Sequence, residues 1–367
     1  MLSMPIPHLY RSLHNHLLQR IPDPCDTRLT NLIYLMMGMF LAGSVQLPKI
    51  ARKLPLRQQK LSVVKRLSRF LDNPAVRPRK WYAPIARQLL LDAGQSGEIR
   101  LIIDCSKVAF GFRLVMVAVA YRRRSLPIAW TWAMGSRGHT TTHIQLALLK
   151  YVRDALLPQH TPVLLVGDGE FSAGIVLDYL RVWGWNYVLR LACDTQVLVH
   201  GSGVMWQRVD SFPLKRDLAL FLPRVTLTRA YPQSSHVLCF HSKTEQTAWF
   251  LATNLPSATL ALQAYKRRMW IEEMFGDMKG NGFDLECSHL GRFLRLSRLT
   301  LAACLMYLWV MAMGEMVKDR QLHAEVDRRR GDLSLFRLGW DFIDRRLALC
   351  DPLPLVSLPN ICSVSGS

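Results

Sequence analysis

From about residue 99 the chain alternates short apolar runs with longer helical patterns, and this alternation limits its fold more than any other feature. The run IRLIIDC contains Asp104 near its end, and the run VLLVGD ends in Asp168. Between them lie RLVMVAVAY and SLPIAWTWAM, joined by three arginines that suit a hairpin turn, and then the helical pattern HIQLALLKYVRDALL. A second helical pattern and the strand NYVLRLA follow. Hydrophobic strands separated by helices are typical of a sheet that helices cover, so the sequence predicts an α/β fold with a mixed sheet.

Patterns outside this stretch divide the rest of the chain. Residues 1–95 have helical periodicity, whereas 191–256 hold β-rich pieces such as RVTLTRAY and HVLCFHS with no convincing helix. Helical patterns return in 257–318, and 319–367 are basic and less regular. We therefore expect a helical N-terminal domain, a sheet-bearing core over 96–190 that resumes at 257–318, a β-rich insertion between them, and a basic C-terminal region.

The charge balance indicates an anionic partner. Lysine and arginine number 47 against 27 acids, a formal net charge of +20, while half of the residues are hydrophobic. Such a folded, basic chain suits nucleic acid or an acidic membrane surface. Between Lys49 and Lys80 eleven cations face one acid, in a helix–break–helix pattern that fits a small DNA-binding module. A solvated basic face of a helical bundle is the alternative. The candidate DNA contacts in this segment are Lys49, Arg52, Lys53, Lys65, Arg66 and Arg69.

Several function classes and locations are disfavoured. The apolar runs Leu32–Leu47 and Leu299–Gly314 are shorter than the roughly 20 residues that a bilayer span requires, so we expect buried helices and no membrane partner. The N-terminus lacks a continuous apolar segment of the secretory kind. Eight cysteines without metal-ligand spacing are typical of reduced thiols in a cytosolic protein. The sequence has no phosphate-binding G-x4-GK[ST] loop, which argues against nucleotide hydrolysis.

A later segment, YKRRMWIEEMFGDMKG, places unusual side chains together. On a single helix, Tyr265, Arg268, Glu272 and Lys279 would share a stripe about 60° wide, whereas Glu273 would lie about 100° away. A core-facing stripe would be apolar, so this one suits a site where a carboxylate meets an anionic polymer. The pattern therefore favours Glu272 over Glu273 as the active carboxylate. Intrahelical ion pairs, such as Arg268 with Glu272, are the alternative.

Three acids then form a candidate active site. Asp104 and Asp168 follow hydrophobic strands of one predicted sheet, and Glu272 lies on a later helix. Carboxylates at strand ends can point into one crevice, although an aspartate after a strand is often only a turn or a helix cap. Their hard oxygens suit Mg²⁺ or Mn²⁺, and two such ions can serve a phosphodiester displacement.

The motifs together resemble a known enzyme family. The chain resembles bacterial insertion-sequence transposases of the DDE type, in the cut-and-paste group with a Tyr-x2-Arg-x3-Glu-x6-Lys signature. Tyr265, Arg268, Glu272 and Lys279 match that spacing, while IIDCS and VGDGEF match the two aspartate blocks. WFLATNLP also resembles the group, and KLPLRQQKLSVVKRLSRFL loosely echoes its N-terminal pattern. The resemblance covers roughly residues 28 to 318.

The resemblance implies a fold and a cofactor. Members of this group have a ribonuclease-H-like catalytic core interrupted by a β-rich insertion, with an N-terminal helical DNA-binding domain. Asp104, Asp168 and Glu272 would be the catalytic residues and would bind two Mg²⁺ ions, with Mn²⁺ as an alternative. The enzyme would then cleave DNA strands and transfer them to a target.

It also implies partners and DNA contacts. Tyr265, Arg268 and Lys279 would contact phosphates near the cleaved element end. Trp249 occupies the position at which a related transposase stacks an aromatic ring on a flipped base, although AWFLATN also suits a core strand. The partners would be double-stranded DNA, as terminal inverted repeats and as target, and a second copy of the chain in a homodimeric DNA complex. The location would be the bacterial cytoplasm, at the nucleoid.

Three other functions stay open on the sequence. A metal-dependent nuclease would cut DNA without strand transfer, and a non-catalytic remnant of a transposase would only bind it. A basic peripheral membrane protein is the third, which the three acids do not explain. Metal-dependent cleavage of labelled DNA ends, followed by their joining to a target, separates these functions.

Overall fold

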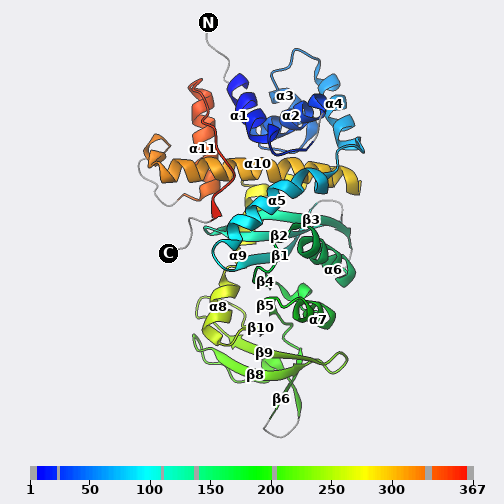
Figure 1. Ribbon diagram of the computed structural model, residues 1–367, viewed down its shortest axis with the longest axis vertical. Helices are drawn as coiled ribbons and strands as arrows, with labels where there is room; N and C mark the ends of the chain where they lie inside the picture. The colour runs from blue at the N-terminus through cyan, green and yellow to red at the C-terminus, as the bar shows by residue number, and fades with distance from the viewer. Residues whose placement is uncertain are drawn as a thin grey trace.

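The computed structural model has its N-terminal helices toward one end and its sheet toward the other. In Figure 1 the N-terminal helices lie at the top, the long helix α10 crosses beneath them, and the sheet continues to the bottom. The structure describes residues 6–22, 25–108, 111–135, 140–200, 205–326 and 333–361.

The first half of the sheet mixes parallel and antiparallel strands, as the sequence predicts. Its strands are β1 (Ile99–Lys107), β2 (Phe112–Tyr121), β3 (Arg124–Met134), β4 (Val163–Gly167) and β5 (Asn186–Arg190). They lie in the order β3-β2-β1-β4-β5, with β1, β4 and β5 parallel to one another and β2 antiparallel to both β1 and β3. The helices α6 (Thr142–Tyr151) and α7 (Gly174–Val182) connect the parallel strands. These strands are buried along most of their length, which explains their continuous apolar sequences.

The expected strands between 191 and 256 are present and extend the same sheet. They are β6 (Gln196–Val199), β7 (Trp206–Arg208), β8 (Leu220–Leu227), β9 (Gln233–Phe240) and β10 (Trp249–Thr253). Within the described residues, β10 pairs antiparallel with β5, and the sheet continues as β10-β9-β8-β6-β7 to ten strands in all. The β-rich segment is therefore built onto the edge that β5 would otherwise leave open.

Long-range ion pairs hold the hairpin turn between β2 and β3. Arg122 and Arg123 have φ angles of 42° and 63°, the positive values that a two-residue hairpin turn requires at both central positions. Arginine is not favoured in this conformation. The Arg122 guanidinium lies 3.6 Å from Glu315 and 3.4 Å from Asp319, both on α10. Contacts with α10 therefore offset the strain of the turn.

The N-terminal helices include the expected helix–break–helix of the basic segment. They are α1 (Ile6–Leu18), α2 (Asp26–Ala42), α3 (Leu47–Lys53), α4 (Lys60–Asp72) and α5 (Pro78–Gly94). The break follows α3 because Leu54 precedes Pro55 and takes an extended conformation, which ends a helix. Gly43, with φ 53°, ends α2 in the left-handed conformation that glycine adopts readily.

A buried central helix and a helix packed along it occupy the C-terminal part. Among the described helices, α10 (Phe293–Asp319) is long and apolar enough to span a membrane, but 94% of its most apolar window is buried in the protein. It is therefore the buried helix that the sequence predicts.

The C-terminal region contains a helix that the sequence analysis did not identify. Helix α11 (Leu335–Ala348) packs along α10, and the Ser334 hydroxyl caps it by accepting from the backbone N–H of Arg337 at 3.1 Å. Two glycines permit the close approach: a Cβ at Gly314 would lie 1.9 Å from the Leu335 carbonyl oxygen, and one at Gly339 2.1 Å from that of Val310. Its buried residues Leu335, Leu338 and Phe342 recur at helical spacing, so the signal for this helix was present in the sequence.

The signature segment is not the predicted single helix, and of the predicted stripe only Tyr265, Arg268 and Glu272 stay together. It forms α8 (Ala258–Lys266) and α9 (Met269–Met278), separated at Arg267 and Arg268. At this break the N–H of Arg268 bonds to the carbonyl of Tyr265 at 2.9 Å, three residues back rather than four. The break lets α8 pack on β4, β5 and β9 while α9 packs on β1, β2 and β3 of the twisted sheet. Lys279 follows α9 with a non-helical backbone and leaves the stripe.

A buried histidine makes the stability of the N-terminal helices depend on pH. His16 of α1 is 3% exposed and donates from Nδ1 to the Val356 carbonyl at 3.1 Å; burial, and then the nearby Arg20, lower its pKa to about 4. The unfolded chain, with a histidine pKa near 6.5, binds more protons between pH 4 and 6.5. The contribution of neutral His16 to the free energy of unfolding is therefore fully present above pH 6.5 and is lost as the pH falls toward 4. Relative to His16→Gln, the wild-type free energy of unfolding should fall by roughly 3 kcal/mol between pH 7 and 4. Denaturant titrations at both pH values measure this, and a constant difference would contradict it.

Candidate active site

Asp104 and Asp168 lie side by side at the carboxyl ends of two parallel strands. In the register of β1 and β4, Ile103 is opposite Gly167, so the next residue on each strand is an aspartate. Neighbouring strands are about 4.8 Å apart, which brings the two positions together as the sequence predicts. Asp168 leaves the strand and opens a short 3₁₀ turn, Gly169–Phe171. Asp104 differs from the expectation in one respect, because β1 continues past it to Lys107 through pairing with β2.

Arg268 joins Asp104 to Glu272. Its guanidinium lies 3.2 Å from Asp104 and 2.6 Å from Glu272, and the arginine is only 7% exposed. Its charged carbon also lies 5.7 Å from the ring centre of Tyr265. The intrahelical Arg268–Glu272 pair is therefore present, and it is part of a larger cluster that reaches across to β1. The predicted contact of Arg268 with a DNA phosphate stays a prediction.

The electrostatics of Asp104 indicate a site that lacks positive charge. Its pKa is raised to about 7, chiefly by burial and to a smaller extent by the charges of Asp168 and Glu272. Arg268 and the backbone N–H of Cys105, which donates to the carboxylate at 2.7 Å, act in the opposite direction. One guanidinium does not compensate three acids, of which Asp104 is buried, so an additional cation would be stabilised here.

The donor chemistry fits divalent metal ions, although the side chains are not yet arranged to hold one. Asp104, Asp168 and Glu272 offer the hard carboxylate oxygens that Mg²⁺ prefers. Over the described ranges, no three histidine, cysteine or acidic side chains lie close enough to share an ion. The Arg268 guanidinium stands between two of the acids. Glu272 has a side chain that is 43% exposed and can rotate away from Arg268.

The neighbouring acids of α9 are engaged elsewhere. Arg124 of β3 lies 3.3 Å from Glu273 and 2.8 Å from Asp277. Burial raises the pKa of Asp277 to about 6, and Arg124 limits that rise. Glu273 therefore points toward the β3 side of α9, which agrees with the preference for Glu272 as the candidate carboxylate.

Trp249, Tyr265 and Lys279 have structural partners. Trp249 begins β10, and its ring meets that of Tyr265 edge-on at 5.1 Å between centroids. Tyr265 is 2% exposed, and both rings belong to a small apolar cluster between α8 and the sheet. Lys279 pairs with Glu286 at 2.6 Å. These contacts favour the core-strand interpretation of Trp249, while its stacking on a base stays a prediction.

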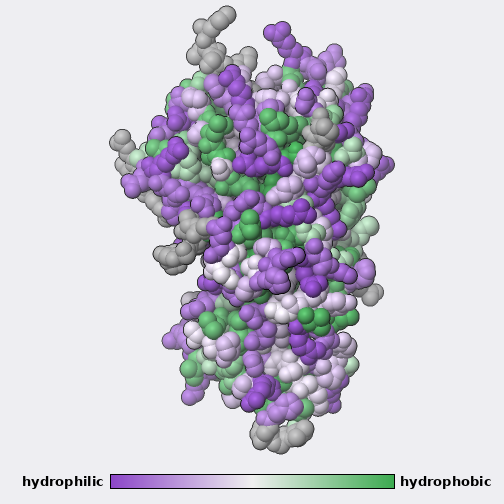
Figure 2. Space-filling model, viewed as in Figure 1, coloured by the Kyte–Doolittle hydropathy of each residue, from purple (hydrophilic) through white to green (hydrophobic). Residues whose placement is uncertain are grey.

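The basic candidates of the N-terminal segment are mostly solvent-facing. Figure 2 shows many hydrophilic residues over the N-terminal helices at the upper end of the molecule. The exposed members are Lys49, Arg52, Lys53, Lys65 and Arg69. Arg66 differs, because it donates to Asn31 Oδ1 at 2.6 Å and lies over the Tyr34 ring at 4.9 Å. Its charge therefore contributes to packing between α2 and α4.

A polar network beside Asp168 was not predicted from the sequence. The Glu170 carboxylate accepts from the Thr140 hydroxyl at 2.8 Å and lies 3.9 Å from Arg113 of β2. Gln145 of α6 donates to the Glu170 carbonyl at 3.0 Å. These bonds tie the turn that carries Asp168 to β2 and α6. The one sequence feature that could have predicted this network is the position of Glu170, two residues after Asp168.

Comparison with known proteins agrees with this arrangement. A model of the family described as Transposase DDE domain matches residues 104–309, more than half of the 367-residue chain, beginning at Asp104 and including Asp168 and Glu272. A search of curated proteins gave no match. The chain belongs to the transposase DDE domain family. It is thus a transposase, an enzyme of the polynucleotidyl transferase type with DNA as its substrate, in a family that normally uses divalent metal.

Proposed function

We propose that the chain is the transposase of a bacterial insertion sequence. It binds the terminal inverted repeats of its element, cuts the DNA strands in a metal-dependent reaction and transfers them to a target, by a cut-and-paste route. The observation that carries the proposal is the meeting of Asp104 and Asp168 at adjacent parallel strand ends, with Arg268 linking Asp104 to Glu272 of α9.

Asp104, Asp168 and Glu272 would hold two Mg²⁺ ions, or Mn²⁺ in their place. Bound ions of this kind supply activation of the attacking oxygen and stabilisation of the leaving oxygen. For Glu272 to act as a ligand, its 2.6 Å ion pair with Arg268 must open. The released guanidinium, together with Lys279, would then be available to a DNA phosphate, which an arginine can bind through two parallel hydrogen bonds.

The strand order supports a ribonuclease-H-like core. The order β3-β2-β1-β4-β5, with one antiparallel hairpin and three parallel strands joined by helices, lies within 96–190. The helices of 257–318 complete this core, and 191–256 form the insertion. The region 319–367 serves dimerisation or DNA contact, and the active complex is a homodimer on DNA at the bacterial nucleoid.

The N-terminal helices of residues 1–95 would bind the element ends through α3 and α4. Their exposed cations neutralise phosphates and release counterions, so affinity falls steeply with salt. The double substitution Arg52→Glu with Lys53→Glu should lower the slope of log affinity against log salt by roughly 1.8, about 0.9 for each lost contact. Fluorescence anisotropy with a labelled end, between 50 and 200 mM salt, measures this.

A matched control for this substitution lies at the other end of the molecule. Lys215 and Arg229 are exposed cations of the β-rich segment, so Lys215→Glu with Arg229→Glu makes the same change in net charge. The control should keep the wild-type slope and affinity for the end. Equal losses in both double variants would show that binding follows overall charge and that α3 has no special part in it.

The function is tested with the inverted repeats that flank the gene. Labelled repeat ends, Mg²⁺ and a target plasmid should give cleaved ends and then joined products. Cleavage without joining would identify a nuclease, and binding without cleavage a non-catalytic remnant. Either result would overturn the proposal.

A further inference from the structure

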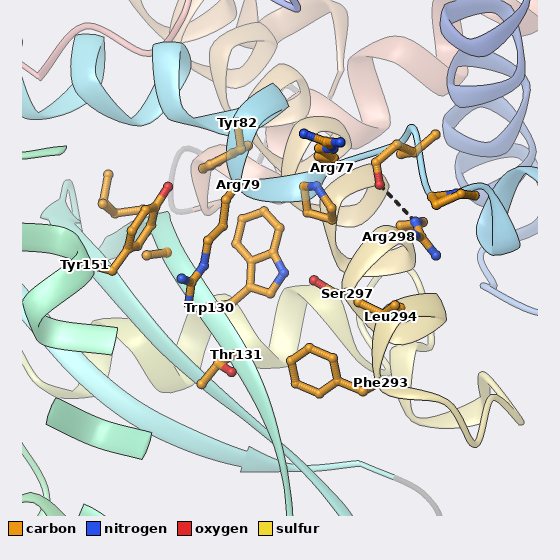
Figure 3. A pocket seen from close by; sticks show the side chains of 15 residues that line it. Arg77, Arg79, Tyr82, Trp130, Thr131, Tyr151, Phe293, Leu294, Ser297 and Arg298 are labelled. Carbon is orange, nitrogen blue, oxygen red and sulfur yellow. Dashed lines mark hydrogen bonds between the residues drawn. The ribbon is translucent and has the colours of Figure 1, made fainter. Parts of the chain in front are cut away.

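A cavity of about 370 Å³ lies at the edge of the sheet, away from the side chains assigned above (Figure 3). It is formed by the beginning of α5, the edge strand β3, the last residue of α6 and the beginning of α10. Its volume is within the range of about 300–1,000 Å³ that small ligands occupy in proteins. The lining residues that matter are Arg77, Arg79, Tyr82, Trp130, Tyr151 and Phe293.

The floor of the cavity is aromatic and rigid. Trp130 is 8% exposed, and Tyr82 packs edge-on against it at 4.9 Å between ring centres. The Tyr82 hydroxyl donates to the Pro127 carbonyl at 2.6 Å, which fixes that ring in turn. In Figure 3 the Trp130 indole lies in the middle of the cavity, between Arg79 on one side and Ser297 and Phe293 on the other. Such a fixed ring offers a flat apolar surface to a ligand without ordering on binding.

The rim combines cations with exposed apolar side chains. Arg77 and Arg79 are exposed, and Arg79 lies over the Tyr151 ring at 4.3 Å. Phe293 and Leu294, at the start of α10, are 46% and 58% exposed. Within the described residues, the lining includes arginines and no acid. The cavity is therefore complementary to a group that has both a flat apolar part and a negative charge.

Trp130 of the cavity is aligned with the candidate catalytic residue Asp104 across the sheet. Trp130 of β3 pairs with Met116 of β2, and Met116 pairs with Asp104 of β1. Two strand spacings separate Trp130 from Asp104, roughly 10 Å between backbones. This is the rise of about three stacked nucleotides of one DNA strand, at 3.4 Å each.

We propose that this cavity binds a single unpaired nucleotide. The base stacks against Trp130 and Phe293, and its phosphate meets Arg77 and Arg79. Base–aromatic stacking of this kind is tolerant of base identity, because every base has a flat face. The proposal rests on the proposed function in one respect, which is that the nucleotide belongs to a DNA strand held at Asp104. A free mononucleotide has the same chemistry and is the other source of such a ligand.

The test uses the full chain in a chelating buffer, where no cleavage occurs. The probe is a ten-nucleotide single strand that carries one 2-aminopurine, compared with its duplex and with deoxyadenosine monophosphate. The wild-type protein should quench the 2-aminopurine and bind the single strand. Phe293→Ala should weaken this binding about tenfold, since stacking contributes about 1–3 kcal/mol and 1.36 kcal/mol is tenfold. Phe293→Tyr, which keeps a ring, should retain it.

The arginines are tested in the same way. Arg79→Ala should weaken binding of the single strand and lower its salt dependence. The control is Arg320→Ala, an exposed arginine at the opposite end of α10, which should bind like the wild type.

Three outcomes decide the proposal. Wild-type affinity and quenching in both Phe293→Ala and Arg79→Ala would overturn it. A change of oligomeric state in Phe293→Ala with unchanged DNA binding would also overturn it, because the occupant would then be protein. Mononucleotide binding as tight as that of the single strand, lost in Phe293→Ala, would support the nucleotide and assign it to the free pool.

The same preparations separate this proposal from the proposed function. If the wild-type protein cleaves labelled ends and Phe293→Ala still binds single strands normally, only the nucleotide-cavity proposal is overturned. If the single strand binds in a Phe293-dependent way but the wild-type protein does not cleave with Mg²⁺, only the proposed catalytic function is overturned.

Discussion

Asp104→Asn should reduce the rate of DNA-end cleavage by at least about 10³-fold. Metal ions at such a site contribute several kcal/mol of transition-state stabilisation, and each 1.36 kcal/mol is tenfold in rate. Asparagine keeps the shape of the side chain and an acceptor oxygen for the Cys105 N–H, so the fold should survive. Asp168→Asn and Glu272→Gln should have comparable effects. Single-turnover cleavage of a labelled end at saturating DNA and Mg²⁺ measures the rate.

Glu273→Gln is the matched control on the same helix. Glu273 neighbours Glu272 but pairs with Arg124, and its side chain is 56% exposed. The control should cleave within about fivefold of the wild-type rate, because an exposed ion pair contributes at most about 1 kcal/mol and 1.36 kcal/mol is tenfold in rate. Equal losses at Glu272 and Glu273 would contradict the assignment of the active carboxylate.

Arg268→Ala should destabilise the protein by about 3–5 kcal/mol, the cost of removing one partner from a buried ion pair. Asp104, only 8% exposed, would keep its burial and lose its cation. Arg268→Lys should cost less in stability. It should still reduce cleavage, because an ammonium group cannot replace the planar guanidinium that bridges two carboxylates or binds a phosphate through two hydrogen bonds. Urea denaturation and single-turnover cleavage measure the two effects.

Lys279→Ala supplies the comparison for Arg268. Its partner Glu286 has a side chain that is 51% exposed, so the loss should be at most about 1 kcal/mol. A loss as small as this for Arg268→Ala as well would show that the Asp104–Arg268–Glu272 cluster is not maintained in solution.

The strands and the aspartates could be predicted because their signals are local. A continuous apolar run predicts a buried strand, and the residue that follows it is placed by the strand itself, which is why Asp104 and Asp168 fall at adjacent strand ends. The buried helix α10 was predictable for the same reason, from an uncharged run of 16 residues. The family resemblance rests on motifs of the same local kind, and the family match agrees with it.

Features that depend on packing between distant segments could not be predicted. A helical wheel treats Tyr265 to Lys279 as one helix, whereas the twist of the sheet divides the segment at Arg268. The contact of Arg268 with Asp104 joins residues 164 positions apart, and no periodicity encodes it. The close crossing at Gly314 and Gly339, and the cavity between β3, α5 and α10, likewise arise only after folding.

The most direct test of the three-carboxylate site is anomalous diffraction from Mn²⁺ in crystals of the protein with an element end. Two peaks about 3.5–4 Å apart, ligated by Asp104, Asp168 and Glu272, are expected, with Arg268 released from Glu272. Manganese bound elsewhere, with Glu272 still paired to Arg268 on bound DNA, would contradict it.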